Sequence, residues 1–137
     1  EPLSFSSIST FCVALKGNKK ARVLDLQRCG LKPFAALSLI RALEGNTSLE
    51  RLDLSHNDEL GTPGLKSLLP SLCLEPKVAS SLSSLLLNSI GIDDSAANDL
   101  LLLSEHGHHI KTLGLRGNSL GDQSAMVLSV ALTKRCP

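Results

Sequence analysis

Apolar residues recur along the chain in a pattern that repeats four times. Each copy fits the frame L-x-x-L-x-L-x-x-N/C-x-L, and the four copies begin at Ala21, Leu49, Leu82 and Ile110. Their starts are separated by 28, 33 and 28 residues, so the chain is built from repeats. The central x-L-x-L-x stretch of each copy alternates between leucine and other residues, which predicts a short β-strand.

The second half of each repeat has helical periodicity. Three columns of mainly apolar residues are separated by four and then three positions, which places them on one face of a helix. The first column is Ile8, Ala36, Leu65, Ala97 and Ala125. The second is Cys12, Ile40, Leu69 and Leu101, with Ser129 as an exception, and the third is Leu15, Leu43, Leu72 and Leu132. Each repeat therefore predicts one strand, a turn and one helix.

A single strand and helix cannot bury their own leucines, so we expect the repeats to stack around one continuous core. Parallel strands lie about 4.8 Å apart, whereas helices are roughly twice as wide, so the stack must curve. This predicts an α/β solenoid with parallel strands on the concave face and helices on the convex face.

The repeat boundaries define a single domain that covers residues 1–137. Residues 1–20 are interpreted as the tail of a preceding repeat, in which Leu3 takes the last leucine position of the frame. The repeats follow at 21–48, 49–81, 82–109 and 110–137. Solenoid ends need polar shielding and neither end has it, so we expect a fragment of a larger protein.

The frame and the period close to 28 residues resemble those of leucine-rich repeat proteins of the ribonuclease-inhibitor-like subclass. The resemblance extends over essentially the whole chain and implies the curved fold described above. It implies a function only at the level of a binding module. The subclass includes enzyme inhibitors, innate immune sensors, actin-capping proteins and an activator of the Ran GTPase.

The resemblance also implies a structural role for the polar residue at each turn. In this family the side chain is expected to hydrogen-bond backbone groups and to form a ladder between repeats. Cys29, Asn57 and Asn118 occupy that position, whereas Ile90 cannot make such bonds. We therefore expect an interrupted ladder at the third repeat.

The second repeat is longer than its neighbours. One additional residue lies near 58–59, and the others fall in residues 74–81, where Pro76 ends the preceding helix. We expect an irregular loop there. Loops on rigid scaffolds often carry function, although neutral drift explains such an insertion equally well.

Alternation along the strands identifies the side chains that face the concave side. The candidate partner-binding residues are Val23, Asp25, Gln27, Arg51, Asp53, Ser55, Leu86, Asn88 and Arg116.

Two of these candidates carry like charges on adjacent strands. Asp25 and Asp53 should lie about 5 Å apart with Arg51 beside them, an arrangement that is mildly unfavourable in a sheet. Either a partner supplies positive charge, or nearby arginines neutralise the pair. Leu86 is apolar at an otherwise polar position and is either an interface anchor or a shielded neighbour of Ile90.

Composition narrows the classes of partner. Fourteen Lys and Arg against thirteen Asp and Glu give a net charge of +1, and three Phe are the only aromatic residues. This balance argues against nucleic-acid and membrane partners. The basic residues at 16–22 are interpreted as cations near a helix C-terminus.

No catalytic, phosphate-binding or metal-binding motif is present, so we expect a non-enzyme with no cofactor, metal or small-molecule substrate. The histidines at 106–109 are interpreted as a solvated turn. Cys12, Cys29, Cys73 and Cys136 lack metal-like spacing and are interpreted as reduced core thiols. The sequence has no signal peptide, which favours an intracellular, cytoplasmic location with the nucleus as the alternative.

These observations favour a non-catalytic scaffold that binds a protein partner of unknown identity through the concave face. Two alternatives stay open. One is a GTPase-activating role of the Ran-activator type, in which the resemblance implies an arginine near a strand end, such as Arg28 or Arg116. The other is a structural spacer inside a larger multidomain protein.

Overall fold

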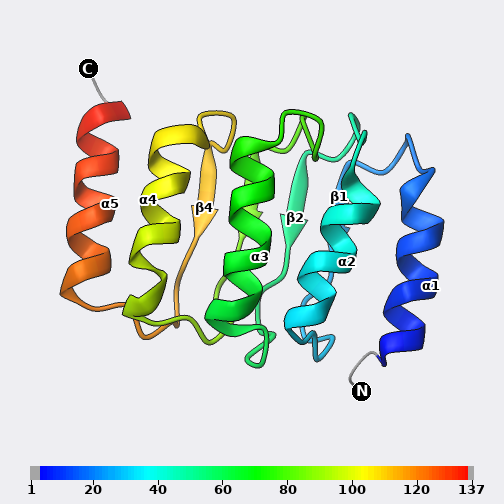
Figure 1. Cartoon of the computed structure of the whole chain (residues 1–137), viewed down its shortest axis with the longest axis horizontal. Helices are drawn as coiled ribbons and strands as arrows, with labels where there is room; N and C mark the ends of the chain where they lie inside the picture. Colours follow the sequence, from blue (N-terminus) through cyan, green and yellow to red (C-terminus); the bar gives the residue numbers. More distant parts are fainter. Residues whose placement is uncertain (1–3, 136–137) are drawn as a thin grey trace.

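The computed structural model describes residues 4–135 of the chain. Within that range helices alternate with short strands (Figure 1). In chain order the elements are α1 (Phe5–Lys16), β1 (Val23–Asp25), α2 (Pro33–Leu43), β2 (Arg51–Asp53), α3 (Gly61–Leu74), β3 (Ser84–Leu86), the 3-10 helix η1 (Asp94–Ala96), α4 (Ala97–His106), β4 (Thr112–Gly114) and α5 (Asp122–Arg135). Leu3 and Cys136, which the sequence analysis singled out, lie outside the described residues.

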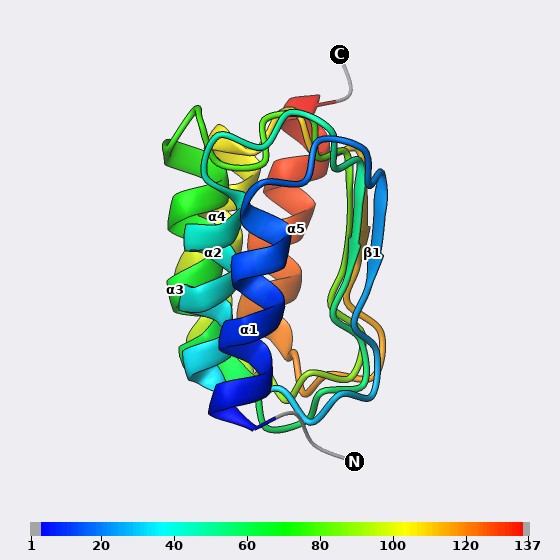
Figure 2. The same ribbon diagram turned by 90° about the vertical axis from the view of Figure 1, so that its right-hand side faces the viewer.

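The strands form one parallel sheet in the order β1-β2-β3-β4. Its register pairs equivalent positions of successive repeats, so that Leu24, Leu52, Leu85 and Leu113 lie side by side across the sheet. Figure 2 shows the strands as one layer and the helices as a second layer on one side of it. The predicted curved α/β solenoid is therefore confirmed.

The core fills the space between the two layers. Leu52 and Leu85 point into it from the central strands and are fully buried. Leu24 and Leu113 are only half-buried, because β1 and β4 each have a paired strand on one side only.

One predicted core position is wrong. Ala125 of α5 is exposed, whereas its neighbour Ser124 is buried. The reason is that α5 lies at the end of the helix row and packs against α4 alone among the other long helices of residues 4–135 (Figure 1). The side chain of Leu132, in the same helix, is not among those that the structure describes.

The insertion in the second repeat is fastened to the repeat before it. Helix α3 ends at Leu74, two residues before Pro76, as the sequence predicts. The N–H of Gly45 then donates to the carbonyl of Lys77 (2.7 Å), and the N–H of Ala79 donates to the carbonyl of Leu43 (3.1 Å). Backbone bonds thus hold the loop against the turn at residues 43–47.

Candidate functional site

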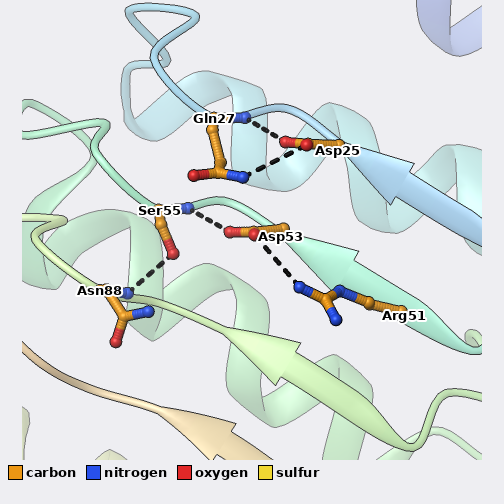
Figure 3. Close-up of polar contacts among 6 residues, drawn as sticks. All are labelled: Asp25, Gln27, Arg51, Asp53, Ser55 and Asn88. Atoms are coloured by element: carbon orange, nitrogen blue, oxygen red, sulfur yellow. Dashed lines mark hydrogen bonds and ion pairs between the residues drawn. The ribbon is translucent and has the colours of Figure 1, made fainter.

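The concave face of the sheet is the candidate site, and its register brings the two predicted carboxylates together. Asp25 in β1 is paired directly with Asp53 in β2, which confirms that they are cross-strand neighbours. Figure 3 shows, however, that each carboxylate interacts mainly with its own repeat.

Asp25, the last residue of β1, accepts hydrogen bonds from Gln27 in the turn that follows the strand. Its Oδ1 accepts a hydrogen bond from the backbone N–H of Gln27 (3.0 Å), and its Oδ2 accepts one from the side-chain amide of Gln27 (3.2 Å) (Figure 3). Asp25 itself stays exposed. Its carboxylate is therefore partly satisfied within the repeat and still accessible to solvent.

Asp53 corrects the sequence interpretation. It is only 4% exposed, and its Oδ1 accepts the backbone N–H of Ser55 (3.0 Å). Its Oδ2 lies 3.8 Å from Nη2 of Arg51, so a local arginine neutralises this one of the two carboxylates (Figure 3). Asp53 therefore presents little surface to a partner, because neighbouring strands and Arg51 enclose it.

Ser55 is also buried, and its side chain connects two repeats. Its Oγ accepts the backbone N–H of Asn88 (3.1 Å), which follows β3 (Figure 3). The Oδ1 of Asn88 in turn accepts the backbone N–H of Arg116, which follows β4 (2.7 Å). Side-chain acceptors thus satisfy the N–H group at the same position of each repeat.

The remaining candidates form the accessible part of the face. Val23 is 60% exposed although it is apolar, and half of the Arg51 side chain is exposed. Arg116 is exposed, and Leu86 is half-buried. The structure therefore leaves an open surface of mixed polarity that runs from β1 to β4.

Asn57 and Asn118 link successive repeats behind this surface. The Oδ1 of Asn57 accepts the N–H groups of Cys29 and Leu31 (both 3.0 Å), and its Nδ2 donates to the carbonyl of Leu26 (3.0 Å). Asn118 makes the same bonds one interface later, to the N–H groups of Ile90 and Ile92 and the carbonyl of Leu87.

The other two turn positions do not link repeats through their side chains. The thiol of Cys29 lies 3.4 Å from the carbonyl of Gln27 in its own repeat. Ile90 is fully buried, and its carbonyl accepts the N–H of Gly61 instead (2.7 Å). A backbone bond therefore replaces the side-chain bond at the third repeat.

Sequence reasoning missed a pair of aspartates that connect helices. The pKa of Asp93 is lowered first by the hydroxyl of Ser95 and then by the N–H of Ser95, and its Oδ1 also accepts the hydroxyl of Thr62 in α3 (3.4 Å). The pKa of Asp94 is lowered first by the hydroxyl of Ser124 and then by the N–H of Gly121. No signal within the repeat frame distinguishes these two carboxylates from surface residues.

A second asparagine position was missed although the sequence contains its signal. Asn18 and Asn46 are 28 residues apart, and each accepts two backbone N–H groups at the turn that leads into a strand. The side-chain amide of Asn46 also donates to the carbonyl of Asn18 (3.3 Å). This turn therefore has its own link between the first two repeats.

The GTPase alternative invokes one arginine near a strand end, and both candidates lie in turns that follow a strand. Arg28 follows β1 and Arg116 follows β4, at opposite ends of the sheet. No group of three or more metal-ligating side chains occurs within residues 4–135.

Cys12, Cys29 and Cys73 form no disulfide bond with one another. Cys12 is buried, which raises its pKa, whereas Cys29 and Cys73 are half-buried. No helix in the same range is long and apolar enough to cross a membrane.

Known proteins resemble this chain in both sequence and fold. The model of the family described as Leucine Rich repeat matches residues 45–69 and 106–129. Ribonuclease inhibitor of Sus scrofa is 38% identical over 109 residues, which cover 80% of this chain and 23% of that protein. NACHT, LRR and PYD domains-containing protein 5 of Bos taurus is 30% identical over 126 residues, which cover 91% of this chain and 11% of that protein.

A solved structure shows the same fold at low identity. Leiomodin-1 Actin-Binding Site 2 superimposes with a TM-score of 0.76 and 14% sequence identity, over 96% of this chain and 74% of the other.

This chain spans less than a quarter of the length of the ribonuclease inhibitor of Sus scrofa and of the Bos taurus NACHT, LRR and PYD domains-containing protein 5.

Proposed function

The chain is a leucine-rich repeat protein of the ribonuclease-inhibitor-like type, and from this we propose that it is a non-catalytic module that binds a protein partner through its concave face. The residues proposed to contact the partner are the accessible ones, with Val23, Asp25, Arg51, Leu86 and Arg116 at their centre.

The observation that carries this proposal is an uncovered parallel sheet. Parallel sheets are usually buried on both faces, because crossover helices cover them. Here the helices of residues 4–135 all lie on one side, and the other side of the sheet is open (Figure 2). An open sheet face on which an exposed valine lies among exposed charged residues is more typical of a protein-binding surface than of a surface that contacts only solvent.

The rigidity of the face supports the same proposal. The N–H groups that follow the strands are bonded to Asp25, Asp53, Ser55 and Asn88, so the side chains around them are held in place. A preorganised surface loses little conformational entropy when a partner binds. Asp53 and Ser55 are assigned to this supporting role rather than to contact.

The proposal is tested with two matched triple variants. The concave variant carries Val23→Glu, Asp25→Lys and Arg116→Glu, and it leaves the Arg51–Asp53 pair intact. The control variant carries Leu37→Glu, Lys66→Glu and Glu105→Lys, which are exposed residues of the helices. Both variants change one apolar and two charged side chains and shift the net charge equally.

Each variant is used for affinity capture from native lysate. We expect a partner that binds the unaltered chain and the control variant but not the concave variant, with unchanged circular dichroism spectra. Loss of the partner from the control variant alone would refute concave-face binding. No specific partner for the unaltered chain would instead favour a structural spacer.

A further inference from the structure

We propose that the β3–β4 half of the concave face recognises an acidic segment of the protein partner, with Arg116 and Asn88 donating to an Asp or Glu carboxylate and Leu86 contacting an apolar neighbour. This inference rests on the proposed function and specifies the chemistry of the partner. The concave positions of these two strands are Ser84, Leu86, Asn88, Thr112, Gly114 and Arg116.

The two halves of the concave face differ in whether their charged side chains already have a partner within the chain. In the β1–β2 half, Arg51 is paired with Asp53, and the carboxylate of Asp25 accepts two bonds from Gln27. In the β3–β4 half, Arg116 carries the only charge among the six concave positions named above. Its side chain is exposed and forms no ion pair within the described part of the chain.

Asn88 adds a second donor whose orientation is fixed. Its Oδ1 accepts the backbone N–H of Arg116 at 2.7 Å, so the acceptor end of the amide is occupied. The Nδ2 group donates to no other residue between 4 and 135 and stays available on the half-exposed side chain. The hydrogen bond also ties this amide to the backbone of the residue that carries the guanidinium.

Gly114 makes room for this arrangement. A Cβ atom there would lie 3.0 Å from both Nδ2 and Oδ1 of Asn88 and 3.0 Å from Cδ2 of Leu86. The side chains of Asn88 and Leu86 therefore occupy the space above Gly114. The amide donor and the apolar contact thus lie together beside the strand that leads to Arg116.

This donor set suits a carboxylate. A guanidinium presents its N–H groups in a planar fork that matches the two oxygens of a carboxylate. One guanidinium balances the single charge of Asp or Glu, whereas a phosphate carries a charge of about −1.5 to −2. A basic segment would repel the guanidinium, and a neutral segment could accept hydrogen bonds but would leave the positive charge of Arg116 without a counter-charge.

The experiment titrates the isotope-labelled chain with acetyl-Glu-Leu-Glu-amide and, separately, with acetyl-Gln-Leu-Gln-amide, followed by NMR. We expect the acidic peptide to shift the side-chain amide of Asn88 and the backbone N–H groups of Gly114 and Arg116, with a Kd on the order of 1 mM. The glutamine peptide, which has the same shape without charge, should bind at least about fivefold more weakly.

Three variants locate the effect. Arg116→Gln should weaken acidic-peptide binding about tenfold, and Gly114→Ala should weaken it by displacing Asn88. Lys66→Gln, which removes an exposed helix cation, should leave it unchanged. Equal affinity for the two peptides, no saturable shift, or shifts confined to the basic residues at 16–22 would each overturn the inference.

Failure of this inference is distinguishable from failure of the proposed function. If a captured partner is lost with Val23→Glu and Asp25→Lys but retained with Arg116→Gln, concave-face binding holds and acidic recognition by the β3–β4 half is refuted.

Discussion

The carboxylate of Asp94 accepts a 2.7 Å hydrogen bond from the hydroxyl of Ser124, a residue of the following repeat. The same oxygen accepts the backbone N–H of Gly121 at 2.7 Å, directly before α5 begins. Asp94 therefore caps the N-terminus of α5 from the neighbouring repeat, where a negative charge is also favoured by the helix dipole. These hydrogen bonds add to the packing of α5 against α4 and link the helix to the preceding repeat.

This cap predicts an acid-sensitive contribution to stability. Because the pKa of Asp94 is lowered from its ordinary value of 3.8 in the folded chain, its stabilising effect is complete above that value. The effect is lost as the pH falls through the lowered folded pKa. Asp94→Asn should therefore lower the melting temperature at pH 7 and flatten the loss of stability below about pH 4.

The measurement is thermal unfolding between pH 2 and pH 7. Glu105→Gln, at an exposed position of α4, serves as the control and should leave the profile unchanged. An Asp94→Asn profile that runs parallel to that of the unaltered chain would show that the carboxylate has no role as a cap.

Asn57→Ala should destabilise the chain by about 2–4 kcal/mol, because it removes the partner of buried N–H and carbonyl groups on two repeats. Asn98→Ala, at an exposed position, should change the free energy of unfolding by less than about 0.5 kcal/mol. Urea unfolding measures both values, and similar effects for the two variants would contradict the structural role of Asn57.

Gly117→Ala should cost about 1–3 kcal/mol, since Gly117 has φ +71° and a Cβ would lie 2.3 Å from Oγ of Ser89. Gly17→Ala is the matched control, because φ there is −99° and an added Cβ would meet no atom within 4 Å apart from those of adjacent residues. Chemical denaturation of both variants tests this, and a neutral Gly117→Ala would show that the turn relaxes.

Two leucines at the same position of different repeats should differ in how much stability is lost when each is replaced by alanine. Leu85→Ala should lower stability by about 2–5 kcal/mol, because Leu85 is fully buried between two strands. Leu113→Ala on the terminal strand should cost roughly half as much, since Leu113 is half-buried. The reverse order in urea unfolding would contradict the placement of β4 at the end of the sheet.

Much of the fold could be predicted from the sequence because one spacing determines both the strand and the helix. Leucine alternation in Leu52–Leu54 and Leu85–Leu87 identified the strands, and their register followed from the repeat itself. The core was misjudged where stacking stops, at Ala125 and at the half-buried Leu24 and Leu113, and also at Leu101, Cys29 and Cys73, which are half-buried. The periodicity of the sequence cannot show that a strand or helix has a neighbouring repeat on one side only.

The candidate site was harder to predict. Alternation shows that Asp53 and Ser55 lie on the concave side, but it does not show that their side chains bond to Arg51 and Asn88. The sequence also did not predict the left-handed backbone conformation in the turn after each strand. Arg28, His56 and Ser89 adopt positive φ at the position that Gly117 holds in the repeat starting at residue 110. Only the glycine gives a sequence signal for that conformation.

The most direct test of concave-face binding places a photo-cross-linking amino acid, p-benzoylphenylalanine, at one of two exposed apolar positions. Val23 is 60% exposed on the strand layer, and Leu37 is 46% exposed on the helix layer. After capture of the partner and irradiation, we expect a covalent adduct with the Val23 variant and none with the Leu37 variant. An adduct at Leu37 but not at Val23 would show that the partner binds the convex face and would contradict the account.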